Sequence, residues 1–321
     1  MNKPLVSLIC GGLNVEKFVN RCFTSVLQQT YENVEFIFIN DGSTDNTSEI
    51  VENFDVDFRN KGYIFKIVNQ KNMGFYPQSG IKISTGKYIC TLDADDVLLP
   101  ESIEKRVGFL EKNPDFAAVR TNGFIVNENN LEDTSKLFVT DEGEEKKTNI
   151  FEDLLYGKTN NWAGSYMIRA FELFKIYPDK IVPMNRYGQN LQILMPVAYR
   201  NKTGFIDEPL MKYIKNESSF TMSANNFEAQ IKQAEEFKNI RLSILELLEL
   251  KNTQFIEKLN LEYNKTFLDI AFSFNKKVNY NKFYIKLEKK TIQDKINFHR
   301  INNNIFSHYI FRILKYIYQK L

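Results

Sequence analysis

The chain reads KYICTLDADD over residues 87–96, an apolar run of β character that ends directly in an acidic cluster. The apolar part predicts a buried strand. Asp93, Asp95 and Asp96 follow it at once. Ligands bind beyond the carboxyl ends of the strands in a parallel sheet. The stretch therefore predicts a strand whose tip presents carboxylates to a ligand.

Strand and helix patterns alternate around this stretch. We expect strands at 5–10, 34–39, 63–68 and 87–92, and helices at 16–27, 45–54, 77–84 and 100–113. Such repeated units predict an α/β fold with a mostly parallel central sheet. A second carboxylate, Asp41, follows the 34–39 strand, so both acidic positions lie at strand carboxyl ends.

The pattern changes after residue 115. Shorter strands are expected at 116–120, 123–126, 162–168 and 209–214, with helices at 150–156 and 188–199; long amphipathic helices are expected at 227–250, 255–274 and 302–321. We therefore expect a domain over 1–220, in two halves (1–115 and 116–220), followed by a helical C-terminal region over 221–321.

Composition excludes several classes of protein. The net charge is only +2 over 321 residues, whereas a nucleic-acid-binding protein usually has a strong basic excess. Cys10, Cys22 and Cys90 are scattered with no CxxC spacing, so a zinc site is not expected. No apolar run approaches the ~20 residues that cross a bilayer, and Met1 leads almost directly into a strand. We expect a cytoplasmic protein.

The Asp93-x-Asp95-Asp96 cluster suits the departure of a diphosphate. Transfer of a sugar from a nucleoside diphosphate builds charge on the leaving group, which Mg²⁺ or Mn²⁺ can neutralise as a Lewis acid. Hard cations prefer carboxylate oxygens. The structural alternative is an acidic turn at the N-terminus of the 100–113 helix, where the helix dipole favours it. A DxD motif alone is common in proteins.

Asp41 also has two readings. Its carboxylate can accept a bond from a base N–H, and Gly42 permits close approach of the backbone. The alternative is an Asx turn with a helix cap, which suits Ser43 to Asp45 best.

Six short motifs follow one another along residues 4–115. They are VSLI (6–9), NVEKF (14–18), SVLQQTY (25–31), NDGSTD (40–45), TGKYI (85–89) and LDADD (92–96). In this order and at this spacing they resemble the family 2 glycosyltransferases, which have the GT-A fold. The combination is highly specific, although each motif alone is not.

The resemblance implies an inverting transferase that uses a UDP-sugar with Mn²⁺ or Mg²⁺, and a role in cell-surface polysaccharide synthesis with a glycan or lipid-linked acceptor. Asp41 would contact uracil, Asp93 the ribose or metal, and Asp95 the metal. Asp96 would contact the donor sugar or support its neighbours. The donor site implied in this way comprises Asn14, Asp41, Gly42, Asn72, Gly74, Asp93, Ala94, Asp95 and Asp96.

The chain departs from the family pattern at three places. Gly11-Gly12-Leu13-Asn14 replaces Pro-Thr-Tyr-Asn, and no Arg-Asn pair precedes Gly74. The amides Gln189 and Asn190 replace an acidic pair that contains the base, and an amide cannot accept the proton. Either the base lies elsewhere, with Asp141, Glu142 and Glu208 as candidates, or Gln189 and Asn190 position the acceptor.

Trp162 and Gly164 are candidates for the acceptor side. The single tryptophan can stack on a sugar ring, or it can belong to the core. His299 and His308, the only histidines, are expected on helix surfaces rather than on a metal. The metal would then depend on Asp93 and Asp95.

The C-terminal end, 300–321, is basic and amphipathic. It suits peripheral contact with an anionic membrane, or packing on the body or on a partner subunit. Two other functions are alternatives to sugar transfer. A non-catalytic scaffold that binds a sugar nucleotide would explain the missing acidic pair. A sugar nucleotidyltransferase is disfavoured because Arg and Lys do not follow Gly11-Gly12.

Overall fold

The computed structural model describes residues 3–140, 143–183, 186–216, 224–250 and 253–302. The chain forms two compact units, residues 1–217 and residues 218–321. Glu142 lies outside the described residues, as do Asp141, His308 and the expected helix beyond residue 302.

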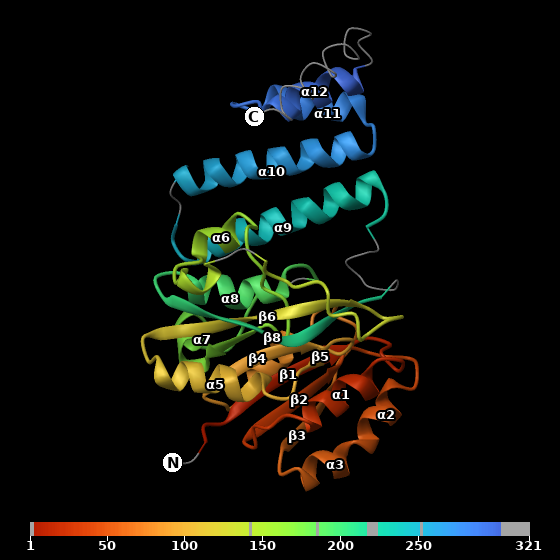
Figure 1. Ribbon diagram of the computed structural model, residues 1–321, viewed down its shortest axis with the longest axis vertical. Helices are drawn as coiled ribbons and strands as arrows, with labels where there is room; N and C mark the ends of the chain where they lie inside the picture. The colour runs from red at the N-terminus through yellow and green to blue at the C-terminus, as the bar shows by residue number, and fades with distance from the viewer. Residues whose placement is uncertain (1–2, 141–142, 184–185, 217–223, 251–252, 303–321) are drawn as a thin grey trace. The chain divides into compact units, whose positions relative to one another are not determined.

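An eight-stranded sheet forms the centre of the first unit within the described residues (Figure 1). The strand order is β3-β2-β1-β4-β7-β6-β8-β5. The pairs β3–β2, β2–β1, β1–β4 and β6–β8 are parallel, and the pairs with β7 or β5 are antiparallel. The expected α/β fold with a mostly parallel sheet is confirmed. The strands are β1 Val6–Gly12, β2 Val34–Asn40, β3 Ile64–Asn69, β4 Tyr88–Asp93, β5 Val97–Leu98, β6 Phe116–Asn127, β7 Tyr166–Arg169 and β8 Lys202–Lys215.

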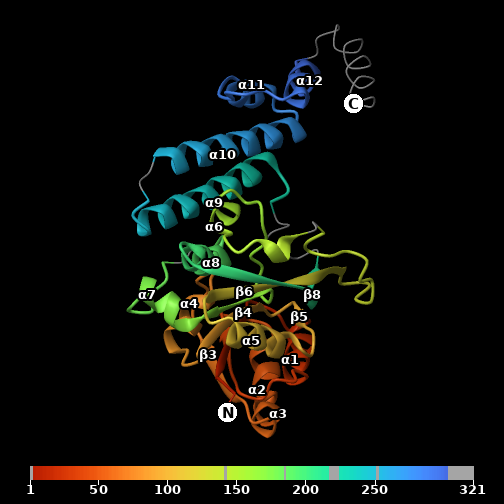
Figure 2. The same ribbon diagram turned by 60° about the vertical axis from the view of Figure 1, so that its left-hand side comes forward.

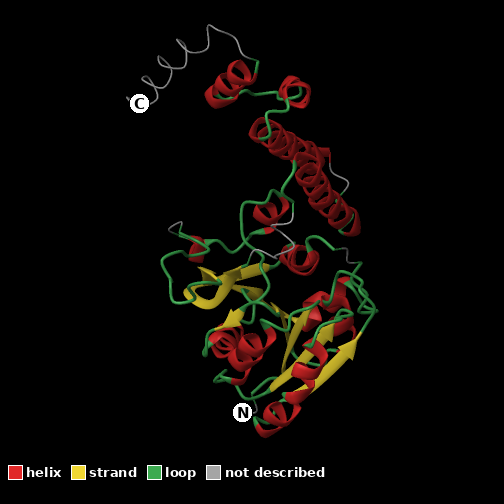
Figure 3. Cartoon of the chain, turned by 90° about the vertical axis from the view of Figure 1, so that its right-hand side faces the viewer, coloured by secondary structure: helices red, strands yellow, loops and turns green. Residues whose placement is uncertain are grey.

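Helices cover both faces of this sheet (Figure 3). One face packs on α1 Val19–Leu27, α2 Thr47–Asn53, α3 Asp55–Asn60 and α5 Ser102–Lys112. The other packs on α4 Pro77–Ile83 and α8 Gln189–Ala198, and α8 also contacts α6 Phe151–Leu155 and α7 Ala170–Ile176. Helices α5 and α8 lie on opposite sides of the β6–β8 pair (Figures 1 and 2).

Successive side chains along each strand point to opposite faces of the sheet. Leu8 and Cys10 of β1 join the core around Phe23, whose ring lies 5.0 Å from the ring of Phe36. Ile9 points to the opposite face, where it lies against Gly80 of α4; a Cβ at Gly80 would come within 2.3 Å of Ile9. Burial of both sets of side chains fixes the register of β1.

The second half of the sheet differs from the expected elements. The two strands expected at 116–120 and 123–126 are one strand, β6, which pairs with β8 over most of its length. Polar Thr121 and Asn122 interrupt the apolar pattern but are buried, and the Asn122 amide donates to Asp207 Oδ1 at 2.9 Å. The strand expected from Trp162 begins only at Tyr166, because residues 163–165 form a turn.

The second unit is helical, as expected for the C-terminal region. Helices α9 Phe227–Leu247 and α10 Thr253–Ser273 lie side by side (Figures 1 and 2). Two further helices, α11 Lys277–Ile285 and α12 Ile292–Ile301, were not expected from the sequence. The core of this unit contains Phe227, Leu268, Ala271, Tyr280, Leu287 and Ile301. Within the described part of the chain, no helix has the length and apolar content to span a bilayer.

Candidate functional site

The two acidic positions follow the two strands that flank β1. In the parallel register, Gly12 of β1 lies opposite Asn40, and Gly11 lies opposite Asp93. The N–H of Asp41 donates to the Gly12 carbonyl at 3.1 Å, and the N–H of Ala94 donates to the Gly11 carbonyl at 3.2 Å. The chain therefore leaves both strands beside the same two glycines.

The loop over residues 70–76 binds the Asp41 carboxylate. Oδ1 accepts from Gln70 Nε2 at 2.7 Å and from the Met73 N–H at 2.9 Å, and Oδ2 accepts from the Gly74 N–H at 2.8 Å. Gly42 has φ +87°, and a Cβ there would lie 2.8 Å from the Asn72 nitrogen. Glycine at 42 therefore lets the loop approach, and Asp41 holds the loop in place.

Tyr76 connects the same loop to Asp93. Its hydroxyl donates to Asp93 Oδ1 at 2.8 Å, and it also lies 3.1 Å from the Leu92 carbonyl. Its ring lies over Gly11, where a Cβ would come within 2.3 Å of the ring. One loop thus contacts both Asp41 and Asp93, which places the tips of β2 and β4 at one edge of the sheet.

The electrostatics of Asp93 and Asp95 are those of crowded, partly buried carboxylates. Burial raises the pKa of Asp93 to about 7, and the negative charge of Asp95 adds to this rise, while the Tyr76 hydroxyl opposes it. Burial likewise raises the pKa of Asp95. Asp95 Oδ2 accepts from Asn216 Nδ2 at 2.8 Å, and the Asp95 carbonyl accepts from Arg21 Nη2 at 3.1 Å.

Asp96 and Ala94 face inward. Asp96 is buried, and its Oδ1 accepts from the Ile214 N–H of β8 at 2.9 Å. Its Oδ2 is buried without a partner among the described residues, and burial, with the charges of Asp95 and Asp93, raises its pKa well above the usual range. Asp96 therefore joins the β4 tip to β8. Ala94 is buried against Gly12.

The Asp93 and Asp95 carboxylates fit a divalent cation by the chemistry of their oxygen atoms. Among the described residues, no group of three or more His, Cys, Asp or Glu is arranged to hold a metal. Asp93 and Asp95 are two hard oxygen donors on one turn, and their mutual repulsion is what a cation relieves. Asp93 and Asp95 would hold the ion. His299 lies on α12 of the second unit.

The amides at the start of α8 lie beside this turn and its loop. Gln189 Nε2 donates to the Gly74 carbonyl at 3.0 Å, and its Oε1 is buried with no partner in the described chain. Asn190 Oδ1 accepts from the Thr91 hydroxyl at 2.8 Å and from the Tyr166 hydroxyl at 2.9 Å. The helix is thus attached to the 70–76 loop through Gln189 and to β4 and β7 through Asn190.

The remaining base candidate with a described position is Glu208. It lies on β8, where its exposed carboxylate forms an ion pair with Lys105 of α5.

Trp162 lies in an aromatic cluster with one part exposed. Its ring stacks on Tyr213 of β8 at 4.8 Å and meets the edge of Phe138 at 4.3 Å. Gly164 has φ +80°, and its N–H donates to the Thr91 carbonyl of β4 at 2.6 Å. A Cβ at Gly164 would come within 2.8 Å of Met211, so this glycine closes the turn tightly over the end of β4.

Asn14 forms hydrogen bonds between the loop after β1 and the loop after β2. With φ +55°, it donates its N–H to the Ser43 hydroxyl at 2.9 Å and accepts from the Thr44 N–H at 2.8 Å. The helix cap expected within Ser43 to Asp45 is wrong: Asn46 is the N-cap residue and makes no side-chain capping bond. The Asp45 carboxylate accepts from the backbone N–H groups of Glu16 and Thr47. The exposed side chain of Asn72 lies on the 70–76 loop.

Four residues of this region were missed in the sequence: Arg21, Gln70, Tyr76 and Asn216. The sequence held one hint of the role of Tyr76. Gly11 stands where the family pattern has proline, and the missing side chain leaves room for a large residue such as Tyr76. Asn216 had none, since it lies 121 residues from its partner Asp95.

Comparisons with known proteins identify the family and the fold of this chain. The model of the family "Glycosyl transferase family 2" matches residues 12–176. An uncharacterized glycosyltransferase of Haemophilus influenzae is 43% identical over 122 residues, which are 37% of this chain and 36% of that protein. One from Rickettsia bellii is 29% identical over 231 residues, 69% of this chain and 30% of that protein. The chain thus covers less than half of the length of these relatives.

Solved structures share the fold. The structure of S. aureus TarS 1-349 in complex with UDP-GlcNAc has a TM-score of 0.59 at 20% identity and covers 92% of this chain and 79% of that one. A mannosyltransferase from Pyrobaculum calidifontis in complex with GDP-Man and Mn²⁺ has a TM-score of 0.50 at 14% identity, over 85% of this chain and 76% of that one. The expected GT-A-like fold is confirmed, and the chain belongs to glycosyl transferase family 2.

Proposed function

We propose that this protein transfers a sugar from a nucleoside-diphosphate sugar, with UDP as the nucleotide, to a glycan or lipid-linked acceptor with inversion. The observation that carries the proposal is the turn at the tip of β4, which bears Asp93 and Asp95 and whose Asp93 contacts the loop that also binds Asp41. Similar folds in complex with UDP-GlcNAc and with GDP-Man and Mn²⁺ support it.

The chemistry is a single displacement at the anomeric carbon. The acceptor oxygen forms a bond to that carbon, the bond to the diphosphate oxygen breaks, and the acceptor proton passes to a base. Bound Mn²⁺ or Mg²⁺ would neutralise the departing diphosphate. Asp93 and Asp95 would orient the donor, Tyr76 keeps Asp93 in position, and Asp41 with Gly42 shapes the 70–76 loop, which carries Asn72 and Gly74, around the nucleotide.

The acceptor half lies in residues 116–220 on this proposal. The exposed part of Trp162 offers a ring on which an acceptor sugar stacks, and Gly164 keeps the backbone close to β4. Gln189 and Asn190 serve as hydrogen-bonding groups that position the acceptor, since their amides do not take its proton. The base is then another group, and Glu142 stays a candidate.

The decisive experiment is donor hydrolysis with Mn²⁺. Purified full-length protein is assayed against a panel of UDP- and GDP-sugars, and Asp95→Asn is compared with Asp57→Asn, an exposed carboxylate on α3. Asp95→Asn is expected to lower metal-dependent hydrolysis by about 100-fold or more, while Asp57→Asn retains the activity. Equal hydrolysis by both variants, with both folded by circular dichroism, contradicts the site.

A second candidate is a non-catalytic scaffold that binds a sugar nucleotide. It is favoured by the amide at 190, whose Oδ1 is bound by two hydroxyls. The same panel separates the two functions by calorimetry. Binding of a UDP-sugar by the unmodified protein without turnover, across the panel and in the presence of acceptor sugars, would select the scaffold.

A further inference from the structure

One face of α11 is strongly exposed and apolar at two positions. Val278 is 81% exposed and Ile285 is 77% exposed. With Lys282 they are spaced i, i+4 and i+7, so the three side chains lie on the same face of the helix. The opposite side of α11 carries Tyr280, which is fully buried in the core of the second unit. Val278 and Ile285 therefore do not belong to the hydrophobic core of the second unit.

The surroundings of this face are basic. Residues 276–302 contain seven lysines and one arginine but only two acidic residues, Glu288 and Asp294. Asp294 is buried in an ion pair with Lys265, so its charge is compensated inside the unit. Ile292, at the start of α12, adds a third large apolar side chain that is 49% exposed. Six lysines are exposed here: Lys276, Lys277, Lys282, Lys286, Lys289 and Lys295.

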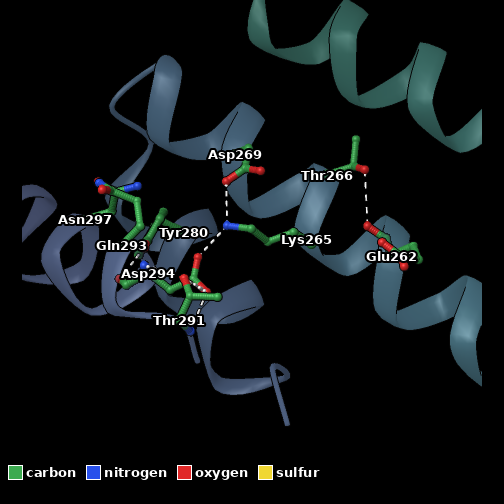
Figure 4. A network of polar contacts seen from close by, with 9 residues as sticks. All are labelled: Glu262, Lys265, Thr266, Asp269, Tyr280, Thr291, Gln293, Asp294 and Asn297. Atoms are coloured by element: carbon green, nitrogen blue, oxygen red, sulfur yellow. Dashed lines mark hydrogen bonds and ion pairs between the residues drawn. The ribbon is translucent and has the colours of Figure 1, made fainter. Parts of the chain in front are cut away.

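A polar network joins α11, which carries this face, to α10 and α12 (Figure 4). Lys265 of α10 contacts Asp269 at 2.9 Å and Asp294 of α12. The Tyr280 hydroxyl of α11 donates to the Asp294 carbonyl at 3.0 Å. Thr291 closes a capping box with Asp294. Because α10, α11 and α12 are joined in this way, the exposed face is held in one orientation within the unit.

We infer that the exposed α11 face, defined by Val278, Lys282, Ile285 and Lys286, binds the surface of an anionic lipid bilayer. Apolar side chains on a helix enter the boundary between headgroups and acyl chains, and neighbouring lysines attract anionic headgroups. Charge decides between a bilayer and a second copy of this chain. A symmetric dimer through this face would bring the same lysines against one another.

This inference goes beyond the proposed function and does not depend on the donor site. It also places membrane contact in residues 278–286, whereas the sequence pattern suggested 300–321. A transferase held at a bilayer in this way would act on a lipid-linked acceptor, which is where the two proposals meet.

Vesicle flotation of the full-length chain tests the inference. Phosphatidylglycerol-containing vesicles are compared with pure phosphatidylcholine vesicles at low and high salt. The unmodified protein is expected to float with the anionic vesicles and to be released by salt. The double variant Val278→Asn/Ile285→Asn is expected to lower the partition coefficient about tenfold or more, and Lys282→Gln/Lys286→Gln to lower it severalfold.

Matched controls are available on the first unit. Val56→Asn/Ile181→Asn changes two exposed apolar residues that are 63% and 54% exposed, and Lys61→Gln/Lys82→Gln changes two exposed lysines. Both controls are expected to bind vesicles as the unmodified protein does. Circular dichroism verifies the fold of every variant, and donor hydrolysis in the same preparations shows whether the active site is intact.

Two outcomes would overturn the inference. Equal flotation of Val278→Asn/Ile285→Asn and the unmodified protein would place any membrane contact elsewhere. Absence of vesicle binding, together with a dimer in sedimentation velocity that this variant converts to a monomer, would identify the face as an interface between copies. Neither outcome alters the hydrolysis experiment on Asp95.

Discussion

At the scale of single residues, Tyr76 and Gly11 act as a pair. The missing side chain at Gly11 makes room for the Tyr76 ring, and the ring position brings the hydroxyl to Asp93. Any side chain at residue 11 would displace the ring. Glycine at residue 11 therefore allows a residue of the 70–76 loop to support one carboxylate of the β4 tip.

Removal of the Tyr76 hydroxyl tests this support. In Tyr76→Phe the ring still fills the space over Gly11, but Asp93 loses a hydrogen bond that lowers its pKa. Because burial and Asp95 already raise that pKa to about 7, the loss raises it further, and less Asp93 is ionised at neutral pH. Protons compete with a metal ion for this carboxylate, so hydrolysis of the donor at pH 7 and limiting Mn²⁺ should fall about tenfold, since a hydrogen bond to a charged group contributes about 1.5–3 kcal/mol.

The pH profile separates this positioning role from a general loss of structure. The acidic limb of the Tyr76→Phe rate profile should move to higher pH, so the defect should shrink above pH 8. Tyr63→Phe is the matched control, because the Tyr63 hydroxyl donates to the Tyr31 carbonyl, away from the β4 tip. A uniform reduction at every pH would contradict the role of the hydroxyl.

The sequence could place Asp93 and Asp95 at the end of a strand but could not predict their partners. Their position depends on a local pattern, an apolar strand followed by a turn. Asn216 and Tyr76 reach them from strands and loops that only the tertiary fold brings close, across separations of 121 and 17 residues. The inward position of Asp96 was also hidden, because its contact with Ile214 depends on the register of β5 and β8.

At the scale of elements, Glu35 joins the parallel strands. Its buried carboxylate accepts from the Ser7 hydroxyl of β1, from Lys66 of β3 at 2.6 Å, and from the Thr85 N–H at 2.9 Å. Burial alone would raise its pKa, but the Lys66 ammonium, Ser7 and Thr85 outweigh that effect and lower it. Glu35 therefore stabilises the fold as an ionised group.

The variant Glu35→Ala tests that contribution. It leaves Lys66 without its ion pair partner and two hydroxyls without an acceptor, so urea unfolding at pH 7 should show a loss of about 3 kcal/mol. The lowered pKa means that the contribution is present above the unfolded value near 4.5 and is lost as the pH falls through the folded value. The difference in the free energy of unfolding between the unmodified protein and Glu35→Ala should therefore become smaller below pH 4.5.

The matched control for Glu35→Ala is an exposed glutamate, Glu32. Glu32→Ala removes an exposed carboxylate paired with Lys3 and should change stability by less than about 1 kcal/mol. If the loss in free energy of unfolding caused by Glu35→Ala stays constant from pH 7 to pH 3, the variant has lost only packing and not the contacts of an ionised carboxylate.

Most elements in the first 115 residues were predicted because they follow a local period, but the short helix α3 and the two-residue strand β5 were missed. The strand at 87–92 and the helix at 100–113 correspond to β4 and α5 within two residues. Beyond residue 115 the sheet depends on β6 and β8, whose pairing crosses about 85 residues and includes register shifts. Buried polar side chains such as Asn122 break the apolar pattern there because their partners lie on other strands.

At the scale of the whole molecule, each unit has a core of its own. The first unit packs α1, α2, α3 and α5 on the sheet around Phe23. The second packs α10, α11 and α12 around Leu268 and Tyr280. Two separate cores predict two cooperative unfolding transitions rather than one.

The chain offers a separate probe for each transition. Trp162 is the only tryptophan and stacks on Tyr213 in the first unit, so its fluorescence follows that unit alone. Ellipticity at 222 nm also follows the second unit, because α9 and α10 are long helices. Thermal unfolding should therefore show a fluorescence midpoint that coincides with only one of two steps in ellipticity.

Donor binding should move only one of these steps. A ligand stabilises the state that binds it by mass action, by about 2.7 kcal/mol at a hundredfold excess over Kd. UDP with Mn²⁺ binds the carboxylates of the first unit on the proposed function, so it should raise the fluorescence midpoint and the matching step in ellipticity by several degrees. Asp95→Asn should lose this shift and Asp57→Asn should retain it. A single transition that both probes share, and that UDP moves as a whole, would mean that the two units unfold as one cooperative body.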